Sequence, residues 1–406
     1  MKSRRLAKGW THRELAELVC VEIECETGRA PGFDAQAYGR IERGEISWPR
    51  AATRRALVAL LDVGSESEIG LFPKRTQRDA EKDEATRRRN FLALGIAAPM
   101  LAEPPRRAGA ADLDEMRARF TRLQDLDNFL GGGDTFRLYF AELAQTEQIL
   151  RRSSCSGSIQ AALTQLAGEQ AQQAGWAAFD AGFPSEALGL YGYSHRAADE
   201  LGNRELAANA LIQIAYTTGD RVAVDAADAA CSTVGDDAPA KARALLESRR
   251  AWSLATAGER DKAARALDAA HTALDDTESA PAAKWFAWMN RTELDIMTGR
   301  VWSVLRDPTR ATAPLERALA SYPDHWARDK ALYMTWLADS LLDAGDTDGA
   351  LATADDALAL AVRVASVRPL ARVAQIAQRS IGLGITGASD LGSRVAAARV
   401  PTPPRL

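Results

Sequence analysis

From about residue 112 to residue 383 the chain reads as one continuous series of amphipathic helical segments. Apolar residues recur there at the three- and four-residue spacing of a helix face, and strand-like alternation is absent. Alanine is frequent throughout, whereas aromatic residues make up only 6% of the 406 residues. This composition favours packed helices over sheets. We therefore expect an all-α protein that is long enough for two or three domains.

Glycines divide this helical region at fairly regular intervals. The joins between helical segments fall at Gly182, Gly219, Gly258 and Gly345, with a fifth predicted at Gly299. Compact or apolar residues stand five positions after and seven positions before the first four joins, at Ala187, Val224, Ala263 and Ala350, and at Gly175, Ile212, Ala251 and Ala338. Small residues let two helix backbones approach closely, and a join glycine lets the chain reverse. The pattern therefore predicts a succession of antiparallel helix pairs.

These helix pairs resemble the tetratricopeptide (TPR) repeat, a pair of antiparallel helices of about 34 residues. The resemblance covers most of residues 135–365 and is best around Gly258 and Gly345. It implies an α-solenoid in which the first helix of each pair lines a concave groove. A generic alanine-rich helical bundle is the alternative interpretation.

Counting back from each join glycine places one set of polar and aromatic side chains on this groove. Asn and Gln can bond the backbone of an extended peptide, while Trp and Tyr supply apolar pockets. We therefore expect the groove to bind a peptide or protein effector. The predicted effector-binding residues are Gln172, Trp176, Asn209, Gln213, Tyr216, Arg249, Trp252, Asn290, Glu293, Trp336 and Asp339.

A shorter pattern occupies residues 11–50. Thr11 can cap a helix with apolar residues on one face, and Asp34 can cap a second helix over residues 35–43. A break that contains Gly and Pro, at residues 28–32, separates the two helices. The sequence therefore predicts two short capped helices in succession, the first extending as far as Glu26.

The run Ile41-Glu42-Arg43-Gly44, followed by Trp48-Pro49, makes this segment resemble the Cro-type (XRE) family of bacterial helix-turn-helix domains. The resemblance implies that residues 35–43 enter the major groove of double-stranded DNA. Gln can pair with adenine and Arg with guanine, whereas arginines on the rim contact phosphates. The predicted DNA-binding residues are Thr11, His12, Ala35, Gln36, Ala37, Arg40, Arg43, Arg50 and Arg54, and Arg4, Arg5, Lys8 and Arg55 are further candidates for phosphate contacts.

The chain is expected to contain four segments. They are a helix-turn-helix domain (1–72), a charged linker with a short apolar helix (73–111), a TPR-like repeat domain (112–383) and a flexible C-terminal tail (384–406). Within the linker, Arg88-Arg89 and the apolar stretch 93–102 look like a twin-arginine export signal. Such signals are N-terminal, so we interpret this one as linker.

Charge is distributed unevenly along the chain. Residues 1–90 hold 18 Lys and Arg against 15 Asp and Glu, whereas the remainder holds 33 against 40. A mildly basic head on an acidic body is typical of a protein with one nucleic-acid contact surface. Because one weakly basic head gives modest affinity, we expect a homodimer on a palindromic operator.

Other classes of site find little support in the sequence. The four cysteines form no C-x-x-C pair and the four histidines are scattered, so neither metal nor disulfide is expected. Gly131-Gly132-Gly133 lacks the Lys of a phosphate-binding loop and is interpreted as a turn. No apolar run reaches membrane-spanning length. We therefore expect a cytoplasmic protein without cofactor, without membrane contact and without enzymatic activity.

An XRE head followed by TPR repeats resembles the peptide-sensing (RRNPP) regulators of bacteria. The resemblance implies a sequence-specific transcriptional regulator whose TPR body dimerises and binds a peptide or protein effector. The alternative from another class is an interaction scaffold, in which the repeats recruit a protein and the head has a minor DNA-binding role.

Overall fold

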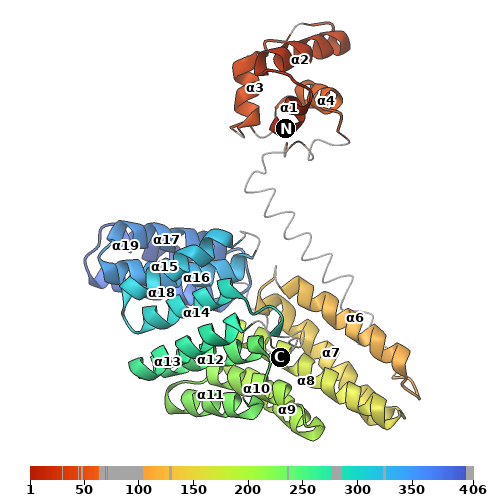
Figure 1. Cartoon of the computed structure of the whole chain (residues 1–406), viewed down its shortest axis with the longest axis vertical. Helices are drawn as coiled ribbons and strands as arrows, with labels where there is room; N and C mark the ends of the chain where they lie inside the picture. Colours follow the sequence, from red (N-terminus) through yellow and green to blue (C-terminus); the bar gives the residue numbers. More distant parts are fainter. Residues whose placement is uncertain are drawn as a thin grey trace. The chain divides into compact units, whose positions relative to one another are not determined.

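The computed structural model describes residues 1–29, 31–43, 45–46, 49–63, 69, 71, 104–127, 130–235, 237–276, 286–322 and 326–398. The chain divides into two compact units, Met1–Gly95 and Ile96–Leu406. The described residues form 18 α-helices and contain no β-sheet (Figure 1). The prediction of an all-α protein is confirmed. Gly44, Trp48, the Arg88-Arg89 motif and the apolar stretch 93–102 lie outside the described residues.

The N-terminal unit contains four helices, α1 (Lys2–Ala7), α2 (His12–Thr27), α3 (Ala35–Glu42) and α4 (Ala51–Leu60). Thr11 and Glu14 form a capping box at the start of α2, and the Asp34 side chain accepts the Ala37 N–H at the start of α3. Gly28 ends α2 with a left-handed φ of 67°. Both predicted helix starts and the long α2 are therefore confirmed, because side-chain caps act locally.

The core of the N-terminal unit lies where α2 meets α3 and α4. Leu15 and Val19 of α2, Tyr38 of α3 and Leu57 of α4 are completely buried there. Burial of these side chains is the main force that holds such short helices together, since isolated helices of this length are marginal in water.

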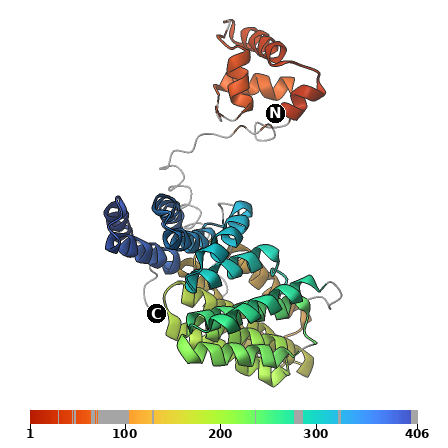
Figure 2. The same cartoon turned by 60° about the vertical axis from the view of Figure 1, so that its left-hand side comes forward.

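The second unit is built from hairpins of neighbouring helices (Figures 1 and 2). It comprises α6 (Ala110–Asp127), α7 (Gly132–Arg152), α8 (Gly157–Asp180), α9 (Pro184–Leu201), α10 (Arg204–Thr217), α11 (Asp220–Val234), α12 (Ala240–Thr256), α13 (Arg260–Asp275), α14 (Arg291–Val304), α15 (Pro308–Ser321), α16 (Ala327–Ala344), α17 (Thr347–Ala361), α18 (Val367–Gly382) and α19 (Ala388–Ala397). Each even-numbered helix from α8 to α18 packs on the next odd-numbered helix and on its even-numbered neighbours. This arrangement is consistent with a helical repeat.

Four of the five predicted joins separate helices, and the fifth is wrong. Gly182, Gly258 and Gly345 adopt left-handed φ values of 90°, 78° and 84°. Gly219 instead precedes α11 with φ −137°, and the next residue, Asp220, is the left-handed one. Gly299 lies inside α14, where an added Cβ would come within 2.4 Å of the Leu315 side chain.

The reversal between α14 and α15 occurs at Arg306, with φ 56°. Arg306 stands seven positions after Gly299. Gly299 therefore occupies the packing position that Gly175 holds in the first pair, and not the join position. The error arose because Arg takes the place of the expected glycine.

The predicted flexible tail is also wrong over part of its length. Residues 388–397 form α19, which packs against α17 and α18, and Leu391 is buried in that contact. Residues 399–406 lie outside the described part of the chain.

The two ends of the helical array meet. The Gly133 N–H donates to the Ala365 carbonyl at 2.8 Å, and an added Cβ on Gly131 would lie 2.4 Å from Ala365. The Gly132 N–H donates to the buried Asp180 carboxylate at 2.8 Å, and the Ser366 hydroxyl donates to it at 2.7 Å. The three glycines therefore allow a close backbone contact at the start of α7, whereas the sequence indicated only a turn.

Candidate nucleic-acid interface and ligand cavity

The side chains of α3 that were predicted to read bases lie at its surface. Gln36 and Arg40 are exposed and stand one turn apart, so they share a face of the helix. Ala35 and Ala37 beside them are half-buried, and Asp34 fixes the first turn through its bond to the Ala37 N–H at 2.7 Å. This face carries one amide and one guanidinium and no bulky apolar group.

The neighbouring arginines make contacts within the N-terminal unit. Arg40 and Arg43 both donate to the Glu45 carboxylate, at 3.3 and 2.7 Å, and the Arg43 bond lowers the pKa of Glu45. Exposed ion pairs of this kind are weak, because water screens the two charges. Arg54 donates to the Pro49 carbonyl at 2.7 Å, while Arg50 is exposed at the start of α4. A phosphate or a guanine could therefore replace Glu45 at small energetic cost.

Arg5 and His12 take part in a polar cluster inside the unit. The Glu42 carboxylate accepts bonds from Arg5 at 3.0 Å, from His12 at 2.6 Å and from the Tyr38 hydroxyl at 3.0 Å. Burial alone would raise the pKa of Glu42, but these three donors together lower it to about 2. The candidacy of Arg5 as a phosphate contact is therefore wrong, because its guanidinium is buried. His12 remains half-exposed, but its ring nitrogen is committed to Glu42.

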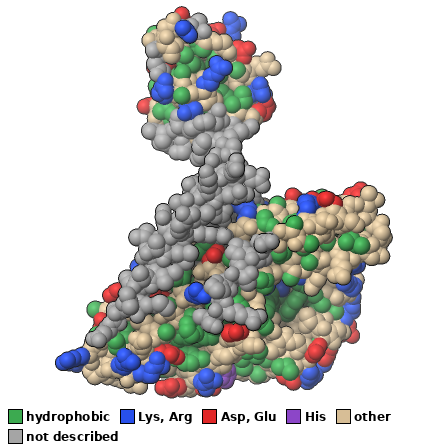
Figure 3. Space-filling model, turned by 180° about the vertical axis from the view of Figure 1, so that it is seen from behind, with side chains coloured by type: hydrophobic (Ala, Val, Ile, Leu, Met, Phe, Trp, Pro, Cys, Tyr) green, Lys and Arg blue, Asp and Glu red, His purple; other side chains and the backbone are tan. Residues whose placement is uncertain are grey.

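The surface of the N-terminal unit carries a dispersed positive charge. Figure 3 shows Lys and Arg side chains spread over the visible face of this unit, with Asp and Glu side chains at its margins. The Thr11 hydroxyl, another predicted contact, caps α2 by accepting the Glu14 N–H at 3.2 Å. Such a distribution is compatible with contacts to a phosphate backbone.

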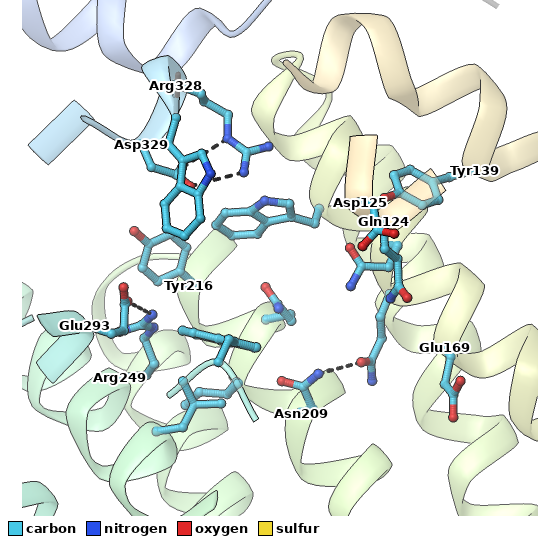
Figure 4. A pocket seen from close by; sticks show the side chains of 18 of the residues that line it. Gln124, Asp125, Tyr139, Glu169, Asn209, Tyr216, Arg249, Glu293, Arg328 and Asp329 are labelled. Carbon is cyan, nitrogen blue, oxygen red and sulfur yellow. Dashed lines mark hydrogen bonds and ion pairs between the residues drawn. The ribbon is translucent and has the colours of Figure 1, made fainter. Parts of the chain in front are cut away.

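The second unit contains a partly open cavity of about 1080 Å³, lined mainly by its even-numbered helices. Figure 4 shows Arg249 and Glu293 on one wall, Gln124, Tyr139 and Glu169 on the opposite wall, and Arg328 with Asp329 above. Eight of the eleven predicted groove residues line this cavity. They are Gln172, Trp176, Asn209, Gln213, Tyr216, Arg249, Asn290 and Glu293.

Three of the predicted amides are already engaged within the protein. Asn209 donates to Gln172 at 2.6 Å (Figure 4). Gln172 in turn donates to the Leu206 carbonyl at 2.9 Å. The Asn290 side chain caps α14 by accepting the Glu293 N–H at 3.0 Å. These three side chains therefore form hydrogen bonds within the protein, and their presence does not require a bound peptide.

The remaining three predicted groove residues, Trp252, Trp336 and Asp339, are not among the residues that line the cavity. Trp252 packs edge-on against Trp336, with the ring centres 5.2 Å apart. Asp339 accepts bonds from Arg306, Arg372 and Arg379, and burial, which would raise its pKa, is outweighed by these arginines. These residues support the cavity and do not line it.

Arg300 lines the cavity and was missed from the sequence. Its guanidinium lies 4.5 Å from the centre of the Trp252 ring and 5.4 Å from the Tyr216 and Trp336 rings. Arg300 stands six positions before Arg306, as Trp176 stands six before Gly182. Counting back from the true reversal would therefore have found it.

The cavity also has an aromatic rim that the repeat pattern did not predict. Trp288, 48% exposed, lies on the segment before α14, and Tyr322 and Trp326 lie between α15 and α16. The Arg249 guanidinium lies 5.8 Å from the Trp288 ring and donates to Glu293 at 2.6 Å. These aromatic residues fall in irregular segments, where helical spacing gives no signal.

Comparisons of the chain with protein-family models, with curated proteins and with solved structures each returned no match. Within the described ranges no helix is both long and apolar enough to cross a membrane. The same part of the chain holds no cluster of three or more His, Cys, Asp or Glu suited to a metal ion.

Proposed function

We propose that the protein is a sequence-specific DNA-binding transcriptional regulator of the helix-turn-helix class. The observation that carries this proposal is α3, a short capped helix that presents Gln36 and Arg40 side by side at the surface. Its N-terminal turn and its two polar side chains match what base recognition in the major groove requires. The resemblance to XRE domains supports the same interpretation.

Selection of binding sites from a random pool of duplex DNA tests the proposal on the full chain. Arg40→Ala should weaken binding to the selected site by about 5- to 150-fold, corresponding to 1–3 kcal/mol, and relax the preference at one base pair. Arg13→Ala is the matched control, because Arg13 is an exposed arginine of α2 whose side chain pairs with Glu17.

The base-reading role of Arg40 would be refuted by an Arg40→Ala variant with unchanged sequence preference. A pool that yields no enriched sequence for the wild-type chain would refute the whole assignment. Arg54→Ala should weaken all sequences alike, because Arg54 is expected to contact phosphate.

In the proposed regulator the cavity of the second unit receives an effector that changes DNA affinity. Its volume is typical of a pocket for a small molecule or for a peptide segment. An effector shifts the DNA-bound population only as far as it binds two arrangements of the protein with different affinity. We place this activity in the cytoplasm, where the chromosome of a bacterium lies.

We further propose that the second unit forms a homodimer, since two heads are needed for tight binding at physiological salt. Sedimentation of the full chain, alone and with a selected operator, tests this. A chain that stays monomeric at micromolar concentration, and one copy per palindromic site, would contradict the dimer.

An interaction scaffold is the second candidate function. The aromatic rim of Trp288, Tyr322 and Trp326 favours it, because exposed aromatic side chains are enriched in protein contacts. The DNA selection separates the two functions: a scaffold would enrich no sequence and would lose its partner on Trp288→Ala.

A further inference from the structure

Arg300 is a buried cation whose charge has no carboxylate partner. It is 4% exposed, and within the described residues no Asp or Glu lies within ion-pair distance of it. It donates to the Tyr216 hydroxyl and to the Met297 sulfur, and three aromatic rings surround it. The cost of removing a guanidinium from water is only partly offset by such contacts.

Three arginines near Arg300 are paired with carboxylates. Arg249 bonds Glu293, Arg368 lies 3.5 Å from the Asp180 carboxylate, and Arg372 bonds Asp339 at 3.1 Å. Arg300 is the exception among these four. The positive charge at this end of the cavity therefore exceeds the negative charge that the chain itself supplies.

Two N–H groups at this end have no acceptor. The Nε of Arg300 and the Nη1 of Arg249 are sealed from solvent and lack a hydrogen-bond partner within the described residues. Bulk water cannot satisfy them, so each carries the full cost of desolvation. Other atoms of both side chains line the cavity, so the positive charge of the two guanidinium groups acts at its wall and favours an oxyanion there.

Tyr216 lies between these arginines and adds a third donor. Its hydroxyl oxygen accepts bonds from Arg300 and from Arg368, the latter at 3.3 Å, which leaves its own proton available for another acceptor. Burial raises the pKa of Tyr216, but the charges of Arg300, Arg368 and Arg249 outweigh burial and lower it overall. The lowered pKa reports a positive potential at this point.

Aromatic side chains adjoin the same place. The ring of Tyr216 lies 5.8 Å from Trp176 and 6.1 Å from Trp252, and Trp176 lines the cavity beside it. Rings of this kind offer flat apolar surface next to the cationic groups.

We propose that this cavity binds a ligand in which an oxyanion, carboxylate or phosphate, is joined to an aromatic ring, with Arg300, Arg249 and Tyr216 as the oxyanion subsite. The proposal specifies the chemistry of the effector in the function proposed above and rests on that cavity. It does not depend on DNA binding.

The test uses the full-length chain without DNA and four probes: benzoate, phenyl phosphate, benzamide and inorganic phosphate. Thermal unfolding and tryptophan fluorescence are followed as each probe is titrated. Benzoate or phenyl phosphate should give a saturable rise in Tm and a change in fluorescence. Benzamide, which has the shape of benzoate without its charge, should give neither. The relative affinities of benzoate and phenyl phosphate distinguish the two oxyanions.

Arg300→Met is the informative variant because it keeps the length of the side chain and removes the charge. It should weaken the benzoate or phenyl phosphate response at least tenfold, while its own Tm stays equal to that of the wild type or rises. Arg310→Met is the matched control, since Arg310 lies 4.6 Å from the Trp302 ring and does not line the cavity. It should bind the probes as the wild type does.

Three results would overturn the proposal: no saturable response to either aromatic anion, an equal response to benzamide, or undiminished binding by Arg300→Met. A response to inorganic phosphate as strong as the response to phenyl phosphate would refute the claim that the ligand carries an aromatic ring. If Arg300→Met fails to fold, Trp288→Ala replaces it as the test, because Trp288 is half-exposed at the rim of the cavity. Weaker benzoate binding by this variant would support binding in the cavity, and unchanged binding would refute it.

Discussion

At the residue scale, the Glu42 cluster shows how one carboxylate organises the N-terminal unit. Glu42 at the end of α3 receives bonds from Arg5 of α1, from His12 of α2 and from Tyr38 one turn earlier. Three helices therefore meet at a single side chain that is only 7% exposed. The position of Glu42 in the Glu-Arg-Gly run has a structural explanation: its carboxylate holds α3 against α1 and α2.

The pKa of Glu42 predicts a specific loss of stability in acid. Because its folded pKa of about 2 lies below the ordinary value of 4.5, the stabilisation is complete above pH 4.5 and is lost as pH falls toward 2. The shift corresponds to about 3 kcal/mol. Hydrogen exchange of residues 12–42 in the full chain, corrected for the intrinsic effect of pH, measures the loss.

Glu42→Gln should lose stability at neutral pH and show little further loss between pH 4.5 and 2. The control is Glu17→Gln, since Glu17 is exposed on α2 and pairs only with Arg13. An acid response of Glu42→Gln equal to that of the wild type would show that another group titrates.

At the element scale, small residues set how closely the helices of a pair approach. Gly175 of α8 faces Tyr191 of α9, and an added Cβ would lie 2.5 Å from the tyrosine ring. Gly299 of α14 likewise allows the close approach of Leu315 of α15, which an added Cβ would meet at 2.4 Å. The equivalent positions Ala251 and Ala338 are completely buried. In these four pairs the approach distance therefore depends on one position of the first helix, whereas α10 holds Ile212 at that position.

Two glycine substitutions should have opposite effects on the stability of the second unit. Gly175→Ala should destabilise it by about 1–3 kcal/mol, because the buried tyrosine ring must move. Gly189→Ala, on the exposed face of α9 with open space around it, should stabilise it by about 0.5–1 kcal/mol. Urea unfolding of the two full-length variants by circular dichroism checks both. Equal effects would show that packing at Gly175 has been misjudged.

At the scale of the second unit, Asp180 joins parts of the chain that are far apart in sequence. Its buried carboxylate accepts from Gly132 at the start of α7 and from Ser366 before α18, and Arg368 lies 3.5 Å away. The same contact brings Arg368 beside Tyr216, at the edge of the ligand cavity. The geometry of the cavity therefore depends on the meeting of the two ends of the array.

Asp180→Ala should loosen both ends together. We expect amide exchange to accelerate at residues 131–136 and at residues 364–368, with a loss of about 3–5 kcal/mol, because a buried ion pair is broken. Asp199→Ala is the control, since Asp199 is exposed on α9 and pairs with His195. Faster exchange confined to α8 would show that the two ends do not depend on this carboxylate.

Local features determined much of this protein from its sequence alone. Thr11 and Asp34 mark the starts of α2 and α3 because a cap bonds the backbone two or three residues away. The spacing of Gly182, Gly258 and Gly345 marks the helix pairs, because each of these glycines adopts a left-handed φ that lets the chain reverse locally. Six of the eight lining residues, all except Asn290 and Glu293, were counted back from correctly placed joins, because helical periodicity determines the inner face of a helix once its end is known.

The tertiary structure alone decided what depends on distant parts of the chain. Arg306 adopts the left-handed turn that Gly299 was expected to provide, so counting back from Gly299 missed Arg300, although Asn290 and Glu293 do line the cavity. The contact of Gly133 with Ala365 depends on the summed angles of many helix pairs. Residues several turns apart on one helix have a fixed relation, whereas segments more than two hundred residues apart meet only through every intervening packing angle.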